Sequence, residues 1–148
     1  MEIVELDLLE NLKLIIAAYL LALPIAWHRE KNARSAGLRT FPLVAVGACA
    51  YVLVSRGILA SAAEDGFHEG IARVIYGLMT GIGFIGGGAI LKNGGRVSGT
   101  ATAASIWNTG AVGLAVAFRY WEIAIILSLI NFLTFEIGSR VKSSDKDD

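Results

Sequence analysis

Apolar residues dominate the chain in five long stretches, and short polar and charged segments separate them. A helix needs about 20 mostly apolar residues to cross about 30 Å of hydrocarbon, because each residue advances about 1.5 Å. The pattern therefore predicts an all-α, polytopic membrane bundle of about five helices. The expected spans are Leu8–Trp27, Phe41–Ala63, Ile71–Leu91, Thr100–Phe118 and Trp121–Gly138. A soluble helical bundle is the alternative, which the weak amphipathicity of the stretches disfavours.

The composition agrees with a membrane protein. Of the 148 residues, 55% are hydrophobic and 18% are charged, whereas soluble domains have about 45–50% apolar and about 25% charged residues. Thirteen Lys and Arg balance thirteen Asp and Glu. The chain therefore has no net positive charge that would attract nucleic acid, and no nucleic-acid partner is expected. Cys49 has apolar neighbours and is expected to be a buried, unreactive thiol. We expect one transmembrane domain over residues 1–138 and a short charged cytoplasmic tail over residues 139–148.

The distribution of cations predicts the orientation in the membrane. Lys and Arg are favoured in cytoplasmic loops. With five spans, one side collects nine cations: Arg29, Lys31, Arg34, Arg39, Lys92, Arg96, Arg140, Lys142 and Lys146. The opposite side keeps Arg119 and most of the acids near span ends. The N-terminus is therefore expected outside and the C-terminus in the cytoplasm, with the bilayer as the first partner.

Glycines crowd the third stretch. Gly81, Gly83 and Gly86 match the dinucleotide pattern GxGxxG, but no strand precedes them, so the match carries no nucleotide site. Spacings of four between glycines let two helices approach closely in lipid and favour a homodimer or other homo-oligomer. The packing candidates are Gly77, Gly81, Gly83, Gly86, Gly87 and Gly88. In the alternative interpretation, Gly86–Gly88 breaks the helix and frees carbonyl groups for an ion.

The fourth stretch carries the most polar helix face. Ser98, Thr102, Ser105 and Thr109 recur at steps of four, three and four, and Asn108 lies beside them. Such groups are expected to face protein or water rather than lipid. One interpretation is hydrogen bonding between helices, with Asn131 as a partner. The other is the lining of a polar cavity.

Several charged residues are candidates for specific contacts. Glu30 and Arg34, and Glu136 and Arg140, are spaced for ion pairs along a helix, and Arg29 belongs to the same cationic loop. Arg39 and Thr40 precede the second span, where they could bind a headgroup phosphate or the loop between the third and fourth spans. Arg56 lies inside the second span and is expected to face a protein partner. Arg73 would join it in an outer cluster with Glu64, Asp65, Glu69 or Glu122.

Enzyme chemistry finds little support in the sequence. His28 and His68 fall on opposite sides of the membrane in the five-span topology, and no HExxH, CxxC, P-loop or nucleophile elbow is present. No catalytic residue, cofactor or metal site is therefore expected.

Four segments taken together resemble the MgtC/SapB family of membrane proteins. They are Arg29-Glu30 with Ala36–Thr40, then Arg73, then Thr80–Leu91, and finally Gly99–Gly113 with Ala103–Trp107. Their order and spacing match over residues of about 12–138. The sequence departs from the family pattern at His28, where the family often has Glu, and at Gly77, where it often has Gln.

The resemblance implies a multi-pass protein of the bacterial inner membrane, in a short form without the soluble C-terminal domain of longer members. It implies adaptation to low magnesium or related stress and, in pathogens, virulence through survival inside macrophages. Some family members are thought to restrain the F-type ATP synthase, so the expected function is modulation of a membrane partner without enzymatic activity. The alternative is a transporter or channel for magnesium or another cation, using the polar face of the fourth span.

Overall fold

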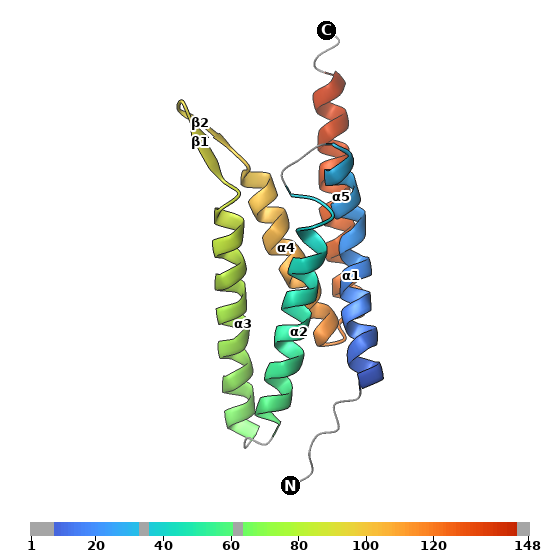
Figure 1. Ribbon diagram of the computed structural model, residues 1–148, viewed down its shortest axis with the longest axis vertical. Helices are drawn as coiled ribbons and strands as arrows, with labels where there is room; N and C mark the ends of the chain where they lie inside the picture. The colour runs from blue at the N-terminus through green and yellow to red at the C-terminus, as the bar shows by residue number, and fades with distance from the viewer. Residues whose placement is uncertain (1–7, 33–35, 61–63, 145–148) are drawn as a thin grey trace.

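Five helices and one small hairpin make up the computed structural model, which describes residues 8–32, 36–60 and 64–144. The helices run alternately up and down, side by side, along one long axis (Figure 1). The elements are α1 (Leu8–Lys31), α2 (Phe41–Leu59), α3 (Glu64–Gly87), β1 (Leu91–Asn93), β2 (Arg96–Ser98), α4 (Thr100–Ala117) and α5 (Trp121–Ser144). The prediction of an all-α bundle of five helices is confirmed.

Three helices extend beyond the predicted spans. α1 continues through His28 to Lys31, α3 begins at Glu64 instead of Ile71, and α5 continues past Gly138 to Ser144. The expected tail at residues 139–148 therefore starts as helix. Hydropathy marks only the part of a helix that suits hydrocarbon, whereas backbone hydrogen bonding can continue into the polar residues that follow.

The predicted loop at residues 92–99 forms an antiparallel hairpin. Lys92 pairs with Val97, and Asn93 pairs with Arg96. Gly94 and Gly95, at the tip, have positive φ angles of 56° and 83°. Two-residue hairpin turns of this kind need positive φ at both central positions, which glycine adopts without a steric penalty.

α4 is the central helix of the bundle and contacts each of the other four helices. Ten of its eighteen residues are buried. The close approach of α4 to α2 depends on Gly113, because a Cβ at this position would collide with the carbonyl oxygen of Ala45. Cys49 is buried nearby in the hydrophobic core, as expected for an unreactive thiol.

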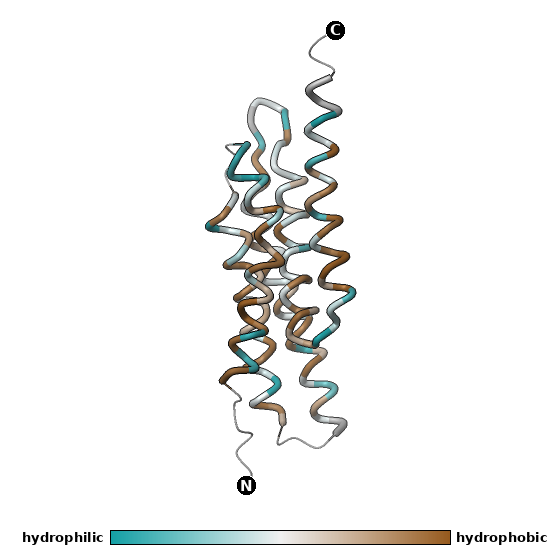
Figure 2. The backbone as a smooth tube through the Cα atoms, turned by 90° about the vertical axis from the view of Figure 1, so that its right-hand side faces the viewer, coloured by the Kyte–Doolittle hydropathy of each residue, from teal (hydrophilic) through white to brown (hydrophobic). Residues whose placement is uncertain are grey.

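The outer faces of the helices are strongly hydrophobic. Leu20, Ile58, Tyr76, Phe84 and Ile130 each expose more than half of their surface. Figure 2 shows long hydrophobic stretches through the middle of the bundle, with hydrophilic segments more frequent toward its ends. Soluble proteins rarely expose apolar surface on this scale, so the exposed faces suit lipid.

Within the described residues, four helical segments are long and apolar enough to cross a membrane: Leu8–Lys31, Phe41–Leu59, Gly66–Gly88 and Trp121–Arg140. α4 falls outside this set because its sequence is more polar. Three of its polar residues, Thr102, Ser105 and Thr109, are buried against other helices. The central position of α4 therefore explains a composition that a lipid-facing helix would not tolerate.

The cationic connectors gather at one end of the bundle. α1 ends, α2 begins, the hairpin projects and α5 finishes at this end, which we call the hairpin end (Figure 1). α2 ends, α3 begins and α4 turns into α5 toward the opposite end. At that turn, Arg119 adopts a left-handed conformation with φ 61° and forms an ion pair of 3.0 Å with Glu10 of α1.

Candidate functional site

Buried polar side chains gather where α4 meets α1 and α5. Thr102, Ser105 and Thr109 of α4 are at most 7% exposed, and Asn131 of α5 and Arg29 of α1 are each 6% exposed. The three α4 residues follow the helical repeat, so one face of the helix presents all of them. The structure thus brings three of the four predicted residues against protein, whereas the prediction was wrong for Ser98, which ends β2 before α4 begins and is exposed.

Asn131 is the centre of a hydrogen-bond network between α4 and α5. Its side-chain oxygen accepts a hydrogen bond of 2.6 Å from the Ser105 hydroxyl. Its amide nitrogen donates to the Thr109 hydroxyl at 3.1 Å and to the Ser105 carbonyl at 3.3 Å. Beside this network, Asn108 donates to the carbonyl of Leu127 at 3.1 Å. The predicted role of Asn131 as partner is confirmed.

Arg29 joins the last turn of α1 to the first turns of α4. Its guanidinium donates to the Thr102 hydroxyl at 2.6 Å and lies over the Phe135 ring of α5, 4.8 Å from the ring centre. A guanidinium is well suited to this environment because it is planar and more weakly hydrated than an ammonium group. Arg29 therefore links three helices at the hairpin end.

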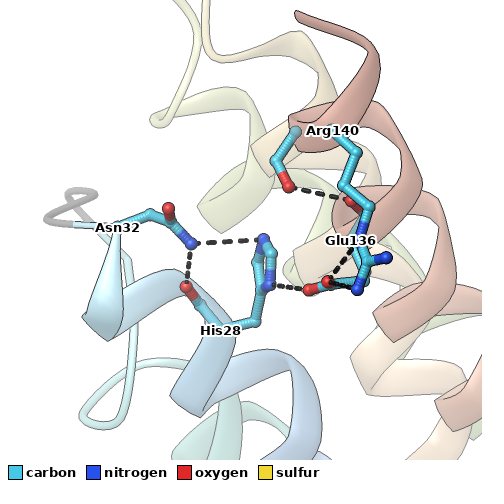
Figure 3. Close-up of polar contacts among 5 residues, drawn as sticks. His28, Asn32, Glu136 and Arg140 are labelled. Atoms are coloured by element: carbon cyan, nitrogen blue, oxygen red, sulfur yellow. Dashed lines mark hydrogen bonds and ion pairs between the residues drawn. The ribbon is translucent and has the colours of Figure 1, made fainter. Parts of the chain in front are cut away.

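His28 makes a second link between α1 and α5, shown in Figure 3. Its Nδ1 lies 3.1 Å from Oε2 of Glu136, and Arg140 donates to the other carboxylate oxygen at 2.7 and 2.9 Å. Asn32 approaches the far ring nitrogen at 3.3 Å. The predicted pair of Glu136 and Arg140 is confirmed, and it extends through His28 to another helix.

A pocket of about 560 Å³ opens beside these two links. Its walls come from the ends of α1 and α5, the start of α4 and the base of the hairpin. Polar lining residues include His28, Arg29, Asn32, Thr100, Thr102 and Ser139. This pocket, with the buried network below it, is the candidate functional site.

The other predicted charged residues lie apart from the pocket's buried links. Glu30 accepts a hydrogen bond of 3.1 Å from the backbone N–H of Leu38, whereas its predicted partner Arg34 lies outside the described residues. Arg39 and Thr40 line a different, more apolar groove between α2 and α3.

Arg56 faces a protein partner, as expected, but the partner is a backbone carbonyl rather than an acid of the expected outer cluster. It donates to the carbonyl of Ala117 at 3.0 Å and lies 5.8 Å from the centre of the Phe118 ring. Arg73 pairs with Glu69 at 2.6 Å on the exposed surface of α3. The expected outer cluster therefore does not form among the described side chains, which exclude Glu64 and Asp65. A backbone carbonyl at the end of α4 satisfies Arg56 instead.

Five of the six candidate packing glycines divide into two groups, and the sixth, Gly88, would place a Cβ 3.2 Å from the carbonyl oxygen of Ile85 in the turn that ends α3. A Cβ at Gly86 would lie 3.0 Å from the carbonyl oxygen of Ala103, so this glycine lets α3 approach α4. Gly77, Gly81, Gly83 and Gly87 have nothing within 4 Å of such an atom. These four make no close contact with another helix in the described part of the chain, so their predicted packing role would require another molecule.

In the alternative interpretation, the carbonyl groups of Gly86–Gly88 would bind an ion, but two of these groups are already used in hydrogen bonds. α3 ends at Gly87, and the carbonyls of Gly86 and Gly87 accept hydrogen bonds from Ala89 and Ile90 at 3.0 Å each. The backbone there closes a turn. Among the described residues, no group of three or more His, Cys, Asp or Glu side chains could hold a metal ion.

Sequence reasoning missed the contact between His28 and Glu136 and the bond from Ser128 to the Leu21 carbonyl, which is 2.5 Å long. One signal was present: Glu136 follows a long apolar run, and acids in such positions usually face protein. The sequence alone does not identify which residue of α1 lies opposite.

Comparisons with known proteins place these elements in one family. The model of the MgtC family matches residues 15–144. Protein SrpB of Synechococcus elongatus is 34% identical, and the match covers 86% of this chain and 74% of SrpB. The Escherichia coli protein named "Putative magnesium transporter YhiD" is 33% identical, with 85% and 59% covered. Protein MgtC of Salmonella typhimurium is also 33% identical, with 86% and 53% covered.

The chain thus spans between about half and three quarters of these relatives' lengths. No solved structure matches it. The family match begins within α1 and ends at the last residue of α5, so it takes in the polar network, the pocket and both groups of glycines. On this evidence the chain belongs to the MgtC family of membrane proteins.

Proposed function

We propose that this chain is a non-enzymatic protein of the bacterial inner membrane that modulates a membrane partner during adaptation to low magnesium or related stress. The observation that carries the proposal is that the polar face of α4 is buried and hydrogen-bonded to other helices. Thr102, Ser105 and Thr109 are buried and hydrogen-bonded to Arg29 and Asn131. Polar groups used in this way hold helices together and leave little for hydrating a moving ion.

The proposed topology has five crossings, an external N-terminus and a cytoplasmic C-terminus. Its support is the gathering of cationic residues at the hairpin end, which includes Lys31, Arg39, Lys92, Arg96 and Arg140. The positive-inside rule assigns such an end to the cytoplasm. α4 then crosses the bilayer as the central helix, in contact with each of the other four.

The partner is proposed from the family resemblance. The F-type ATP synthase is the candidate, and the two proteins would meet within the membrane. Self-association is a second proposed contact, which Gly87 would favour because no described residue occupies the space beside it.

Cation transport is the second candidate function. The name of the YhiD relative points to magnesium, and the polar pocket at the hairpin end would be its entrance. The charge of the site argues against it, since the buried guanidinium of Arg29 at the pocket wall would repel a divalent cation.

A flux measurement separates these two functions. We expect purified protein in liposomes loaded with a magnesium-sensitive dye to give no Mg²⁺ entry above that of empty liposomes. Reproducible Mg²⁺ entry that Ser105→Ala or Asn108→Ala abolishes, while Thr80→Ala preserves it, would establish transport and reject the proposal. Thr80 is the control because its hydroxyl bonds within α3 and it lies outside the pocket.

The proposed partner needs a separate test. In inverted membrane vesicles, we expect added expression of this chain to lower ATP-driven proton pumping, and cross-linking to recover subunits of the synthase. Unchanged pumping together with no cross-linked subunit would remove the synthase as the partner.

A further inference from the structure

A groove of about 780 Å³ runs between α2 and α3 in the halves that approach the hairpin end. Leu43, Val44 and Tyr51 line it from α2, and Leu78, Ile82 and Phe84 line it from α3. Most of this lining is apolar. The groove is separate from the polar pocket, because it lies on the other side of α2 from α1 and α5.

Glycines create the groove. At the opposite end of the same helix pair, a Cβ at Gly70 would lie 2.7 Å from the Leu59 side chain, so the helices touch there. Beside the groove, Gly47, Gly77 and Gly81 have nothing within 4 Å of the position of a Cβ. The missing side chains therefore leave space along one stretch of an otherwise packed helix pair.

One end of the groove is cationic. Arg39 and Thr40 line it just before α2 begins. Arg39 is exposed, and no carboxylate of the described residues forms an ion pair with it. An arginine beside an apolar groove at the end of a membrane helix is placed to meet a phosphate group at the membrane surface.

We propose that this groove binds one anionic glycerophospholipid, with its phosphate at Arg39 and Thr40 and an acyl chain between α2 and α3. The dimensions agree. Twelve residues of helical rise separate Arg39 from Tyr51, which is about 18 Å, and half of the hydrocarbon core is about 15 Å thick. The groove thus reaches from the headgroup region of one leaflet to about the middle of the bilayer.

A second copy of the chain fits the groove less well. Most homodimers have two-fold symmetry, and such a dimer across this face would bring the two Arg39 residues to the same membrane depth. Like charges at one interface oppose association. A lipid supplies the opposite charge and a flexible apolar chain together.

Native mass spectrometry of the full chain in detergent tests the proposal, with phosphatidylglycerol as the probe and phosphatidylcholine of the same acyl chains as the comparison. We expect one phosphatidylglycerol to be retained per chain, more tightly than phosphatidylcholine. Arg39→Gln should weaken phosphatidylglycerol binding about fivefold, in line with about 1 kcal/mol per basic residue. Arg96→Gln, at the same end but outside the groove, should leave binding unchanged.

Gly81→Leu tests the apolar part of the site. The new side chain enters open space, so the fold should persist, and we expect lipid affinity to fall about tenfold or more because the groove is filled. Gly83→Leu is the matched control, since it lies on the same helix in equally open space but outside the groove. Circular dichroism would verify that both variants remain folded.

Three results would overturn the proposal. The first is equal retention of lipid by Gly81→Leu and the unaltered chain. The second is equal loss of lipid with Gly81→Leu and Gly83→Leu. The third is a dimer that only Gly81→Leu dissociates without any change in lipid binding, which would assign the groove to a second copy. None of these results depends on the protein's partner or on magnesium.

Discussion

Single polar side chains in this bundle form hydrogen bonds across large distances in sequence. Ser105 and Asn131 are 26 residues apart, Arg29 and Thr102 are 73 apart, and His28 and Glu136 are 108 apart. Hydrocarbon offers no alternative partners, so each such bond fixes how one helix is rotated and raised against another.

Removing the centre of the network should weaken the bundle without unfolding it. We expect Asn131→Ala to lower the free energy of unfolding by about 1 to 2 kcal/mol, because the Ser105 and Thr109 hydroxyls lose their shared partner. Unfolding by SDS titration in mixed micelles would measure the change. Thr134→Ala is the control on α5, because the Thr134 hydroxyl bonds only within its own helix. Equal destabilisation by both variants would contradict the role assigned to Asn131.

Sequence spacing predicted part of this network and could not predict the rest. The steps of three and four from Thr102 to Thr109 define one helix face whatever the rest of the fold does. The partner of Arg56 is different in kind, because a backbone carbonyl carries no sequence signature. Only the turn at the end of α4 brings the Ala117 carbonyl within its reach.

At the scale of helices, glycine has two opposite uses. Gly113 and Gly86 let α4 approach α2 and α3 so closely that backbone atoms of the neighbouring helix occupy the space of a side chain. Gly77, Gly81 and Gly83 leave space empty. The sequence shows the same residue in both situations, so spacing predicts that glycines matter but not which of them face a neighbour.

This difference predicts contrasting effects of the same substitution. Gly113→Ala should lower the free energy of unfolding by about 1 to 3 kcal/mol, because the new methyl group meets the Ala45 carbonyl and the α2 backbone must shift. Gly83→Ala should be neutral or slightly stabilising, since alanine favours helix and nothing lies beside it. The same SDS titration would compare them. A neutral Gly113→Ala would show that α2 and α4 are less closely packed than described.

At the scale of the whole molecule, residues exposed at the two ends of the bundle can test its orientation in the membrane. We expect Lys31→Cys and Lys92→Cys to react with a membrane-impermeant maleimide only from the cytoplasmic face, and His68→Cys and Tyr120→Cys only from the outside. These residues are exposed at opposite ends of the bundle. The unaltered chain is the control, because its one cysteine, Cys49, is buried.

Labelling of Lys92→Cys and Tyr120→Cys from the same face would mean that α4 does not cross the bilayer. That result would leave four crossings with the direction of α5 reversed, or three crossings if α5 also stays on one side of the membrane. The hydropathy of α4 alone does not decide between these topologies, because its polar residues face protein.

The central position of α4 has a consequence for biosynthesis. α2 packs against α4, yet 58 residues separate the end of α2 from the end of α4, which corresponds to about 3 to 12 s of translation. During that interval the first three helices can pack only against lipid and against one another. The hydrophobic core can form only after α4 has left the translocon. α5 then packs against α4 and brings Asn131 to its hydrogen-bond partners.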